Sequence, residues 1–235
     1  MTRCNSTEST PNTRVNISTY ILGALAILIS LFFISRAINQ VIDYLNHPLE
    51  NAVVKADIDG IKQAIAKGCD VNAEDDSSHT ILTSAIWYGR YSQKIRRKPE
   101  LRQQRIFEML EILINAGANV NVSDRYGETP LIAAISSEYH LSPFVPTEIK
   151  EPTKIINLLI ANGADVNIKN RVTGNAPLHE AVYLGNLEII AILIENGANV
   201  NVENVYVNGE KPLKIALEND NKEVVELLRR HGAKE

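Results

Sequence analysis

The sequence is poor in several residue types that mark specialised protein classes. It has only two cysteines, Cys4 and Cys69, in 235 residues, which excludes a disulfide framework. Its 12 glycines and 9 prolines are too few for a collagen-like or Pro/Gly-rich fibrous chain. The net charge is only −4 and gives no reason to expect nucleic-acid binding. An apolar content of 45% is too high for a wholly disordered chain.

Motifs for catalysis and cofactor binding are also missing. The five histidines form neither an H-x-x-x-H nor an H-E-x-x-H arrangement, and the cysteines lack metal-ligand spacing. The glycine-rich phosphate-binding motifs and the G-x-S-x-G nucleophile motif are absent. We therefore predict a protein that is not an enzyme and has no cofactor and no metal site. We expect His179 to make structural hydrogen bonds and Cys69 to be a small packing residue.

One long segment of the chain is apolar and uncharged. Residues 15–35 lie between Arg14 and Arg36 and include the run YILGALAILISLFFI. As a helix these 21 residues would span about 31 Å, close to the thickness of the hydrocarbon core of a bilayer. The segment predicts a single-pass transmembrane helix, and a cleaved secretory signal peptide is the alternative. The basic residues that flank it slightly favour an internal amino terminus, so the side of the membrane stays open.

A short motif recurs along the rest of the chain. GCDVN occurs at 68–72, GANVN at 117–121, GADVN at 163–167 and GANVN at 197–201, and a truncated copy is present at 232–233. An apolar run with helical spacing precedes each copy, and a Thr-Pro-Leu-like tripeptide lies further upstream. Thr can cap a helix and Pro suits its first position, whereas Gly can adopt the left-handed conformation that ends a helix. Each unit is therefore predicted to form helix, turn, helix and projecting loop, and units must stack to bury their apolar faces.

This pattern resembles the ankyrin repeat family. Residues 176–201, APLHEAVYLGNLEIIAILIENGANVN, are close to the family pattern and have its ordinary spacing. The resemblance covers about residues 47–235 and implies an all-α ankyrin-repeat solenoid of about five repeats, with an elongated partner-binding surface made by inner helices and loop tips. It also implies that the repeat domain lies in the cytoplasm, whereas the basic residues that flank residues 15–35 weakly favour the opposite side. Ile81 replaces the usual Pro, and Ala176 and Lys211 replace the usual Thr. Each missing Thr cap lowers the stability of its helix by about 1 kcal/mol.

The predicted domain organisation follows from these segments. A polar tail (1–14), a transmembrane helix (15–35) and a connector helix (36–46) precede the ankyrin repeat domain (47–235). The expected repeats are about 47–76, 77–125, 126–172, 173–206 and 207–235. The second and third repeats exceed the regular spacing by 16 and 13 residues, which places insertions at 90–105 and 137–153, between the two helices of each repeat. Insertions there lengthen a turn and are tolerated.

The first insertion is strongly basic. Its basic residues are Arg90, Lys94, Arg96, Arg97, Lys98, Arg102 and Arg105, against one acid, Glu100. Two interpretations remain open: a contact with anionic lipid headgroups or an acidic protein, or a solvated, Arg-rich extension of a helix. The second insertion contains three prolines and is predicted to be a loop.

Large aromatic and arginine residues, which are enriched at interface hot spots, provide the candidate partner-binding positions. These are Trp87, Tyr88 and Tyr183 near the ends of first helices, and Arg125, Tyr126, Arg171 and Tyr206 in the loops. Local packing between neighbouring loops is the competing interpretation. We expect a membrane-tethered, non-catalytic scaffold that binds another protein. The alternatives are a secreted or periplasmic repeat protein after signal cleavage, and an accessory or regulatory subunit of an enzyme.

Overall fold

The computed structural model divides the chain into two compact units, Met1–Asn46 and His47–Glu235. It describes residues 29, 35, 47–74, 78–91, 99–137, 152–207 and 209–235, and of residues 88–91, 99–103 and 152 it describes the backbone alone. The predicted polar tail (1–14) and connector helix (36–46) lie outside the described residues, as does the predicted transmembrane helix except for Ile29 and Ser35. In the part of the chain that is described, no helix is both long enough and apolar enough to cross a bilayer.

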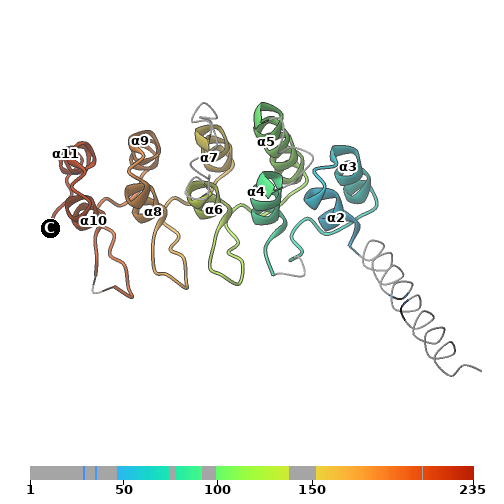
Figure 1. Ribbon diagram of the computed structural model, residues 1–235, viewed down its shortest axis with the longest axis horizontal. Helices are drawn as coiled ribbons and strands as arrows, with labels where there is room; N and C mark the ends of the chain where they lie inside the picture. Colours follow the sequence, from blue (N-terminus) through green and yellow to red (C-terminus); the bar gives the residue numbers. More distant parts are fainter. Residues whose placement is uncertain are drawn as a thin grey trace, which may run out of the picture. The chain divides into compact units, whose positions relative to one another are not determined.

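The described residues of the second unit form helices joined by turns, which confirms the expected all-α class. The helices follow in pairs: α2 (Pro48–Val54) with α3 (Ile58–Ala66), α4 (Ile81–Tyr91) with α5 (Pro99–Asn115), α6 (Pro130–Ser136) with α7 (Pro152–Ala161), α8 (Pro177–Leu184) with α9 (Leu187–Glu195), and α10 (Pro212–Glu218) with α11 (Lys222–Arg230). One isolated bridge joins Glu74 and Thr80. Figure 1 shows the pairs stacked side by side in two rows. We call α2, α4, α6, α8 and α10, which lie next to the loops, the inner helices, and the other five the outer helices.

The helix ends follow from the repeated motif. The glycines that open the motif copies, Gly68, Gly117, Gly163, Gly197 and Gly232, all have φ between 84° and 93°, the left-handed conformation predicted for a helix end. At the start of α6, the Thr129 hydroxyl accepts the backbone N–H of Ile132 at 3.3 Å. Ala176 offers no such cap to α8. This helix start is instead held by His179, whose Nδ1 accepts the N–H of Ala176 at 3.0 Å.

His179 also joins two repeats, which fulfils its expected hydrogen-bonding role. Its ring is fully buried, and its Nε2 lies 3.0 Å from the carbonyl oxygen of Glu210. Since Nδ1 acts as an acceptor, Nε2 carries the proton and donates to that carbonyl. Burial lowers the pKa of His179, because removal from water disfavours the charged imidazolium.

A ladder of asparagine side chains connects successive repeats at the motif turns. Its members are Asn72, Asn121, Asn167 and Asn201, the last residue of each full motif copy. Each Nδ2 donates to the carbonyl of the glycine that opens the next copy, at 2.8–3.2 Å. Each Oδ1 accepts the backbone N–H two residues after that glycine, at 2.7–2.9 Å. The ladder thus explains why the same residue type ends every copy: one amide supplies both a donor and an acceptor.

The apolar core is continuous through the stack. A single cluster of buried side chains extends from Leu49 in α2 to Leu228 in α11. Each inner helix packs against the next, from α2 to α10. No helix pair buries its apolar face alone, so each repeat depends on its neighbours for stability, as in other repeat proteins.

The described part of the first insertion is helical. Helix α4 extends to Tyr91 and α5 begins at Pro99, so residues 99–105 form an extension of the outer helix, which does not distinguish the two interpretations above. At its end, Arg105 donates from Nη1 to the carbonyl of Ala56 in the first repeat, at 3.1 Å. Residues 92–98 of this insertion, and residues 138–151 of the second, lie outside the described residues.

Candidate protein-binding face

Among the loops that project beyond the inner helices, three are closed in the same way. They span residues 124–128, 170–175 and 204–210, and we call them the fingers (Figure 1). In each finger the backbone N–H of the first residue donates to the carbonyl of the last, at 2.7–3.0 Å. The side chain of the first residue, Asp124, Asn170 or Asn204, accepts the backbone N–H two residues later, at 2.7–2.9 Å. These Asx turns use the local hydrogen bonding typical of Asp and Asn.

The predicted loop candidates connect one finger to the next. Arg171 donates from Nη2 to the carbonyl of Asp124 at 2.6 Å, and the Tyr206 hydroxyl donates to the carbonyl of Arg171 at 2.9 Å. The Arg125 guanidinium lies 4.7 Å from the centre of the Tyr126 ring, a cation–π distance. Arg171 and Tyr206 therefore connect neighbouring fingers, whereas Arg125 and Tyr126 contact each other within one finger. Tyr126 and Tyr206 also keep 46% and 63% of their surface exposed.

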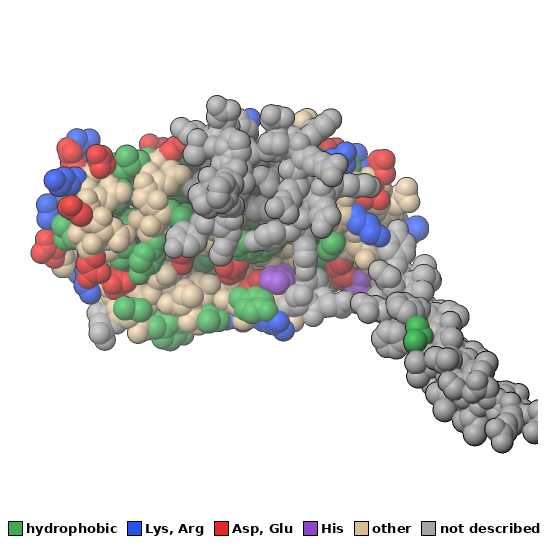
Figure 2. All heavy atoms as spheres, viewed as in Figure 1, with side chains coloured by type: hydrophobic (Ala, Val, Ile, Leu, Met, Phe, Trp, Pro, Cys, Tyr) green, Lys and Arg blue, Asp and Glu red, His purple; other side chains and the backbone are tan. Residues whose placement is uncertain are grey.

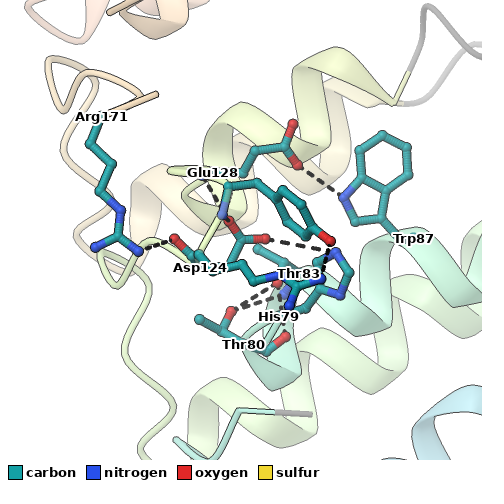
Figure 3. A network of polar contacts seen from close by, with 9 residues as sticks. His79, Thr80, Thr83, Trp87, Asp124, Glu128 and Arg171 are labelled. Carbon is teal, nitrogen blue, oxygen red and sulfur yellow. Dashed lines mark hydrogen bonds and ion pairs between the residues drawn. The ribbon is translucent and has the colours of Figure 1, made fainter. Parts of the chain in front are cut away.

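A polar network lies between the first described finger and α4 (Figure 3). The Asp124 side chain is fully buried, and its Oδ1 accepts the backbone N–H groups of Tyr126 and Glu128. Its Oδ2 lies 3.9 Å from His79 Nε2. Directly before α4, the Thr80 hydroxyl accepts the N–H of Thr83 at 3.2 Å. The network holds the finger against the inner helix that precedes it.

Trp87 and Tyr183 occupy equivalent places on α4 and α8, seven residues after Thr80 and Ala176. Trp87 is half-buried and donates from Nε1 to Glu128 Oε2 at 3.1 Å. Tyr183 is 45% exposed and donates to Glu210 Oε2 at 2.7 Å. In both cases the acceptor is the last residue of the following finger. Trp87 was expected near the end of its helix, but α4 continues to Tyr91.

Burial and neighbouring carboxylates together raise the pKa of two residues at this face, Glu128 and Tyr183. Burial raises the pKa of Glu128, and the charges of Asp124 and Glu180 raise it further, whereas the hydrogen bond from Trp87 opposes the shift. Burial, the hydrogen bond to Glu210 and the carboxylates of Glu210, Glu180 and Glu218 raise the pKa of Tyr183 to about 12. Each shift shows that additional negative charge is disfavoured at this face.

Apolar side chains are exposed along the fingers. We call Tyr126, Val172, Val205, Tyr206 and Val207 the finger patch. Val172 and Val205 are 60% and 63% exposed. Figure 2 shows apolar side chains along the lower edge of the repeats, where the fingers lie in Figure 1. Clusters of exposed apolar residues with a polar surround mark interaction surfaces in soluble domains.

The structure does not describe the side chains of several residues that the sequence suggested for partner or lipid binding. The side chains of Tyr88, Arg90 and Arg102 are not described, and Lys94, Arg96, Arg97 and Lys98 lie outside the described residues. Within the described ranges, no group of three His, Cys, Asp or Glu residues could hold a metal ion.

Sequence reasoning missed two acceptors on this face, Glu128 and Glu210. Both stand directly before the Thr-Pro-Leu-like tripeptide. An acid at that position, combined with an aromatic residue on the preceding inner helix, is the signal that would have found them.

Comparisons with known proteins agree with this architecture. Residues 148–235 match the model for ankyrin repeats in three copies. Palmitoyltransferase ZDHHC13 of Homo sapiens is 32% identical over 110 residues, which cover 47% of this chain and 15% of that protein. Putative ankyrin repeat protein FPV233 of Fowlpox virus is 34% identical over 73 residues, 31% of this chain and 12% of that protein.

A third relative is matched over most of its length. Putative ankyrin repeat protein YahD of Escherichia coli is 28% identical over 186 residues, 77% of this chain and 78% of that protein. The match to the palmitoyltransferase, by contrast, spans only about 15% of its length. The recurring motif, the stacked helix pairs and these matches together show that the chain contains ankyrin repeats.

Proposed function

We propose that this protein is a non-catalytic scaffold that binds another protein through the fingers and inner helices. The observation that carries the proposal is the finger patch. Its apolar side chains remain exposed although the backbone that bears them is fixed by hydrogen bonds within and between fingers. A rigid surface lowers the entropy cost of association.

The test compares the partners of the full chain with those of a variant altered only at exposed finger positions. Val172→Ser with Val205→Ser removes apolar surface from side chains that are about 60% exposed, so we expect the fold to be unchanged. The matched control is Val54→Ser with Leu187→Ser, which alters exposed apolar residues of α2 and α9. Proximity labelling should give a partner set that the finger variant loses and the control retains. If both variants label the same proteins equally, the fingers do not bind the partner.

We further propose that residues 15–35 tether the scaffold to a membrane as a single-pass helix, with the repeat domain in the cytoplasm. The support is the uncharged apolar run in the sequence and its length relative to a bilayer. Alkaline extraction should leave the full chain in the membrane fraction and release a chain that lacks residues 15–35. Intact mass of the mature chain addresses the secreted alternative, since loss of about the first 35 residues would indicate signal cleavage. Protease accessibility on sealed cells identifies the side.

The basic insertion at 90–105 provides a second membrane contact in this proposal. Each basic residue near an anionic surface contributes about 1 kcal/mol. We therefore expect the chain to bind anionic vesicles more tightly than neutral ones. Arg96→Glu with Arg97→Glu should reduce that binding, and equal binding by this variant would refute the lipid contact.

A further inference from the structure

Two equivalent sites on the inner face combine an aromatic ring with a carboxylate. In the first, Trp87 of α4 meets Glu128, and in the second, Tyr183 of α8 meets Glu210. Each ring donates its polar hydrogen to the carboxylate and leaves part of its apolar surface in contact with solvent. An aromatic face beside a carboxylate favours an approaching cation twice, through the ring quadrupole and through the charge.

The described charged residues of this face are the carboxylates of Asp124, Glu128, Glu180, Glu210 and Glu218 and the basic side chains of Arg125, Arg171 and Lys214. Glu180 lies between the two sites and raises both the Glu128 and the Tyr183 pKa, and Glu218 acts on Tyr183 as well. Lys214 lies 3.8 Å from Glu210 and 3.6 Å from Glu218, and His79 lies 3.9 Å from the buried Asp124. Burial is the main cause of the raised Glu128 pKa, and the charges of Asp124 and Glu180 add to it. A bound cation would offset those two charges.

We propose that this face binds an extended, cationic segment of the partner protein, with one Arg or Lys side chain at Trp87–Glu128 and a second at Tyr183–Glu210. The inference rests on the proposed binding function and adds the chemistry of the partner. Arg suits these sites especially well because its planar guanidinium can stack on a ring while it donates to a carboxylate.

The stack also sets the spacing of the two cations. The sites lie on α4 and α8, with α6 between them. Packed helices are about 10 Å apart, so the sites are separated by about 20 Å. An extended chain advances about 3.3 Å per residue, which places the two basic residues about six positions apart.

Trp87 is the only tryptophan of the chain and therefore reports binding at the first site directly. The experiment titrates the full chain with synthetic Gly/Ser peptides and follows Trp87 fluorescence and peptide anisotropy. One peptide carries two Arg residues six positions apart, a second carries them two positions apart, and a third carries two Glu residues six positions apart. We expect the first peptide to change Trp87 fluorescence and to bind about tenfold more tightly than the second, because only it reaches both sites.

A charge-neutral variant separates the carboxylates from general surface charge. Glu128→Gln with Glu210→Gln keeps an oxygen acceptor for Trp87 and Tyr183, and we expect it to weaken binding of the six-spaced Arg peptide about tenfold. The control, Glu111→Gln with Glu195→Gln, removes two exposed charges from the outer helices α5 and α9 and should leave binding unchanged. Circular dichroism checks that both variants are folded.

Three results would overturn the proposal: equal affinity of the two double variants, a preference for the Glu peptide, or no binding of the six-spaced Arg peptide. If the finger variant loses its labelled partners while the Arg peptide shows no preference, the binding function stands and the cationic partner is refuted. If labelling shows no partner that depends on the fingers, the proposed function itself fails, whatever the peptides do.

Discussion

Removal of one side chain from the asparagine ladder should weaken a single interface between repeats. Asn121→Ala deletes two hydrogen bonds between the second and third motif copies. These are the Nδ2 bond to the carbonyl of Gly163 and the Oδ1 bond from the N–H of Asp165, both 2.8 Å long. A neutral hydrogen bond contributes about 0.5–1.5 kcal/mol net. Because both bonds are exposed and water can replace them, we expect a loss of about 1–2 kcal/mol in the free energy of unfolding.

The neighbouring Asn162 provides a matched control. Its Nδ2 donates to the carbonyl of Leu158 at 2.8 Å, an exposed bond of similar length inside one repeat. Asn162→Ala is thus the same substitution without the loss of an interface bond, and we expect an effect within about 0.5 kcal/mol. Asn121→Ala combined with Asn167→Ala breaks two separate interfaces and should cost about 2–4 kcal/mol, since distant sites add.

The assay is urea unfolding of the full chain, followed by far-UV circular dichroism and by Trp87 fluorescence. The midpoint should fall for Asn121→Ala and fall further for the double variant, with little change for Asn162→Ala. If Asn121→Ala and Asn162→Ala destabilise the chain equally, the ladder is a geometric consequence of stacking and does not stabilise the interfaces.

Three other predictions follow from single residues. Gly163 has φ of 86° and open space around its missing Cβ, so Gly163→Ala should cost about 1 kcal/mol in urea unfolding and Gly163→Asn less; equal losses would point to sterics instead of backbone conformation. The pKa of His179 is lower in the folded chain than the 6.5 of the unfolded chain. Its contribution to stability is therefore present above pH 6.5 and is lost as the pH falls toward the folded pKa. Urea unfolding midpoints should decrease on mild acidification, and His179→Gln should flatten that dependence. The raised pKa of Glu128 has the opposite effect, because the folded state holds the proton more tightly and stability falls as the pH rises above the ordinary value of 4.5. Glu128→Gln should therefore gain stability relative to the parent between acidic and neutral pH, and a constant difference across that range would contradict the shift.

The helices could be predicted from the sequence because the residues that start and end a helix act on their immediate neighbours. A left-handed glycine, a Pro at the first helical position and an apolar run at helical spacing act within one turn of the chain, and the structure confirms the glycines 68, 117, 163, 197 and 232 at helix ends. The expected role of His179 also followed from its position after Pro-Leu. The transmembrane prediction for 15–35 and the roles of the candidate binding residues stay predictions.

Other features depend on contacts between residues 27–47 positions apart, which lie too far apart in the sequence for a local pattern to contain both partners. The Trp87–Glu128 and Tyr183–Glu210 pairs join an inner helix to the finger that follows it. Arg171 and Tyr206 were predicted as candidates for partner binding, yet their hydrogen bonds connect neighbouring fingers. Only the register of the stack brings these groups together.

By itself, the sequence determined that the chain repeats, that the motif glycines end helices, and that the units must stack, because no unit can bury its apolar face alone. The tertiary structure decided what the repeats do for one another. Stacking lets the last Asn of each motif copy form hydrogen bonds to the next repeat. It also places two aromatic–carboxylate pairs on one face. The physical reason is that stacking brings each residue to its equivalent in the next repeat, and hydrogen bonds and charges act over a few ångströms in space, irrespective of distance along the chain.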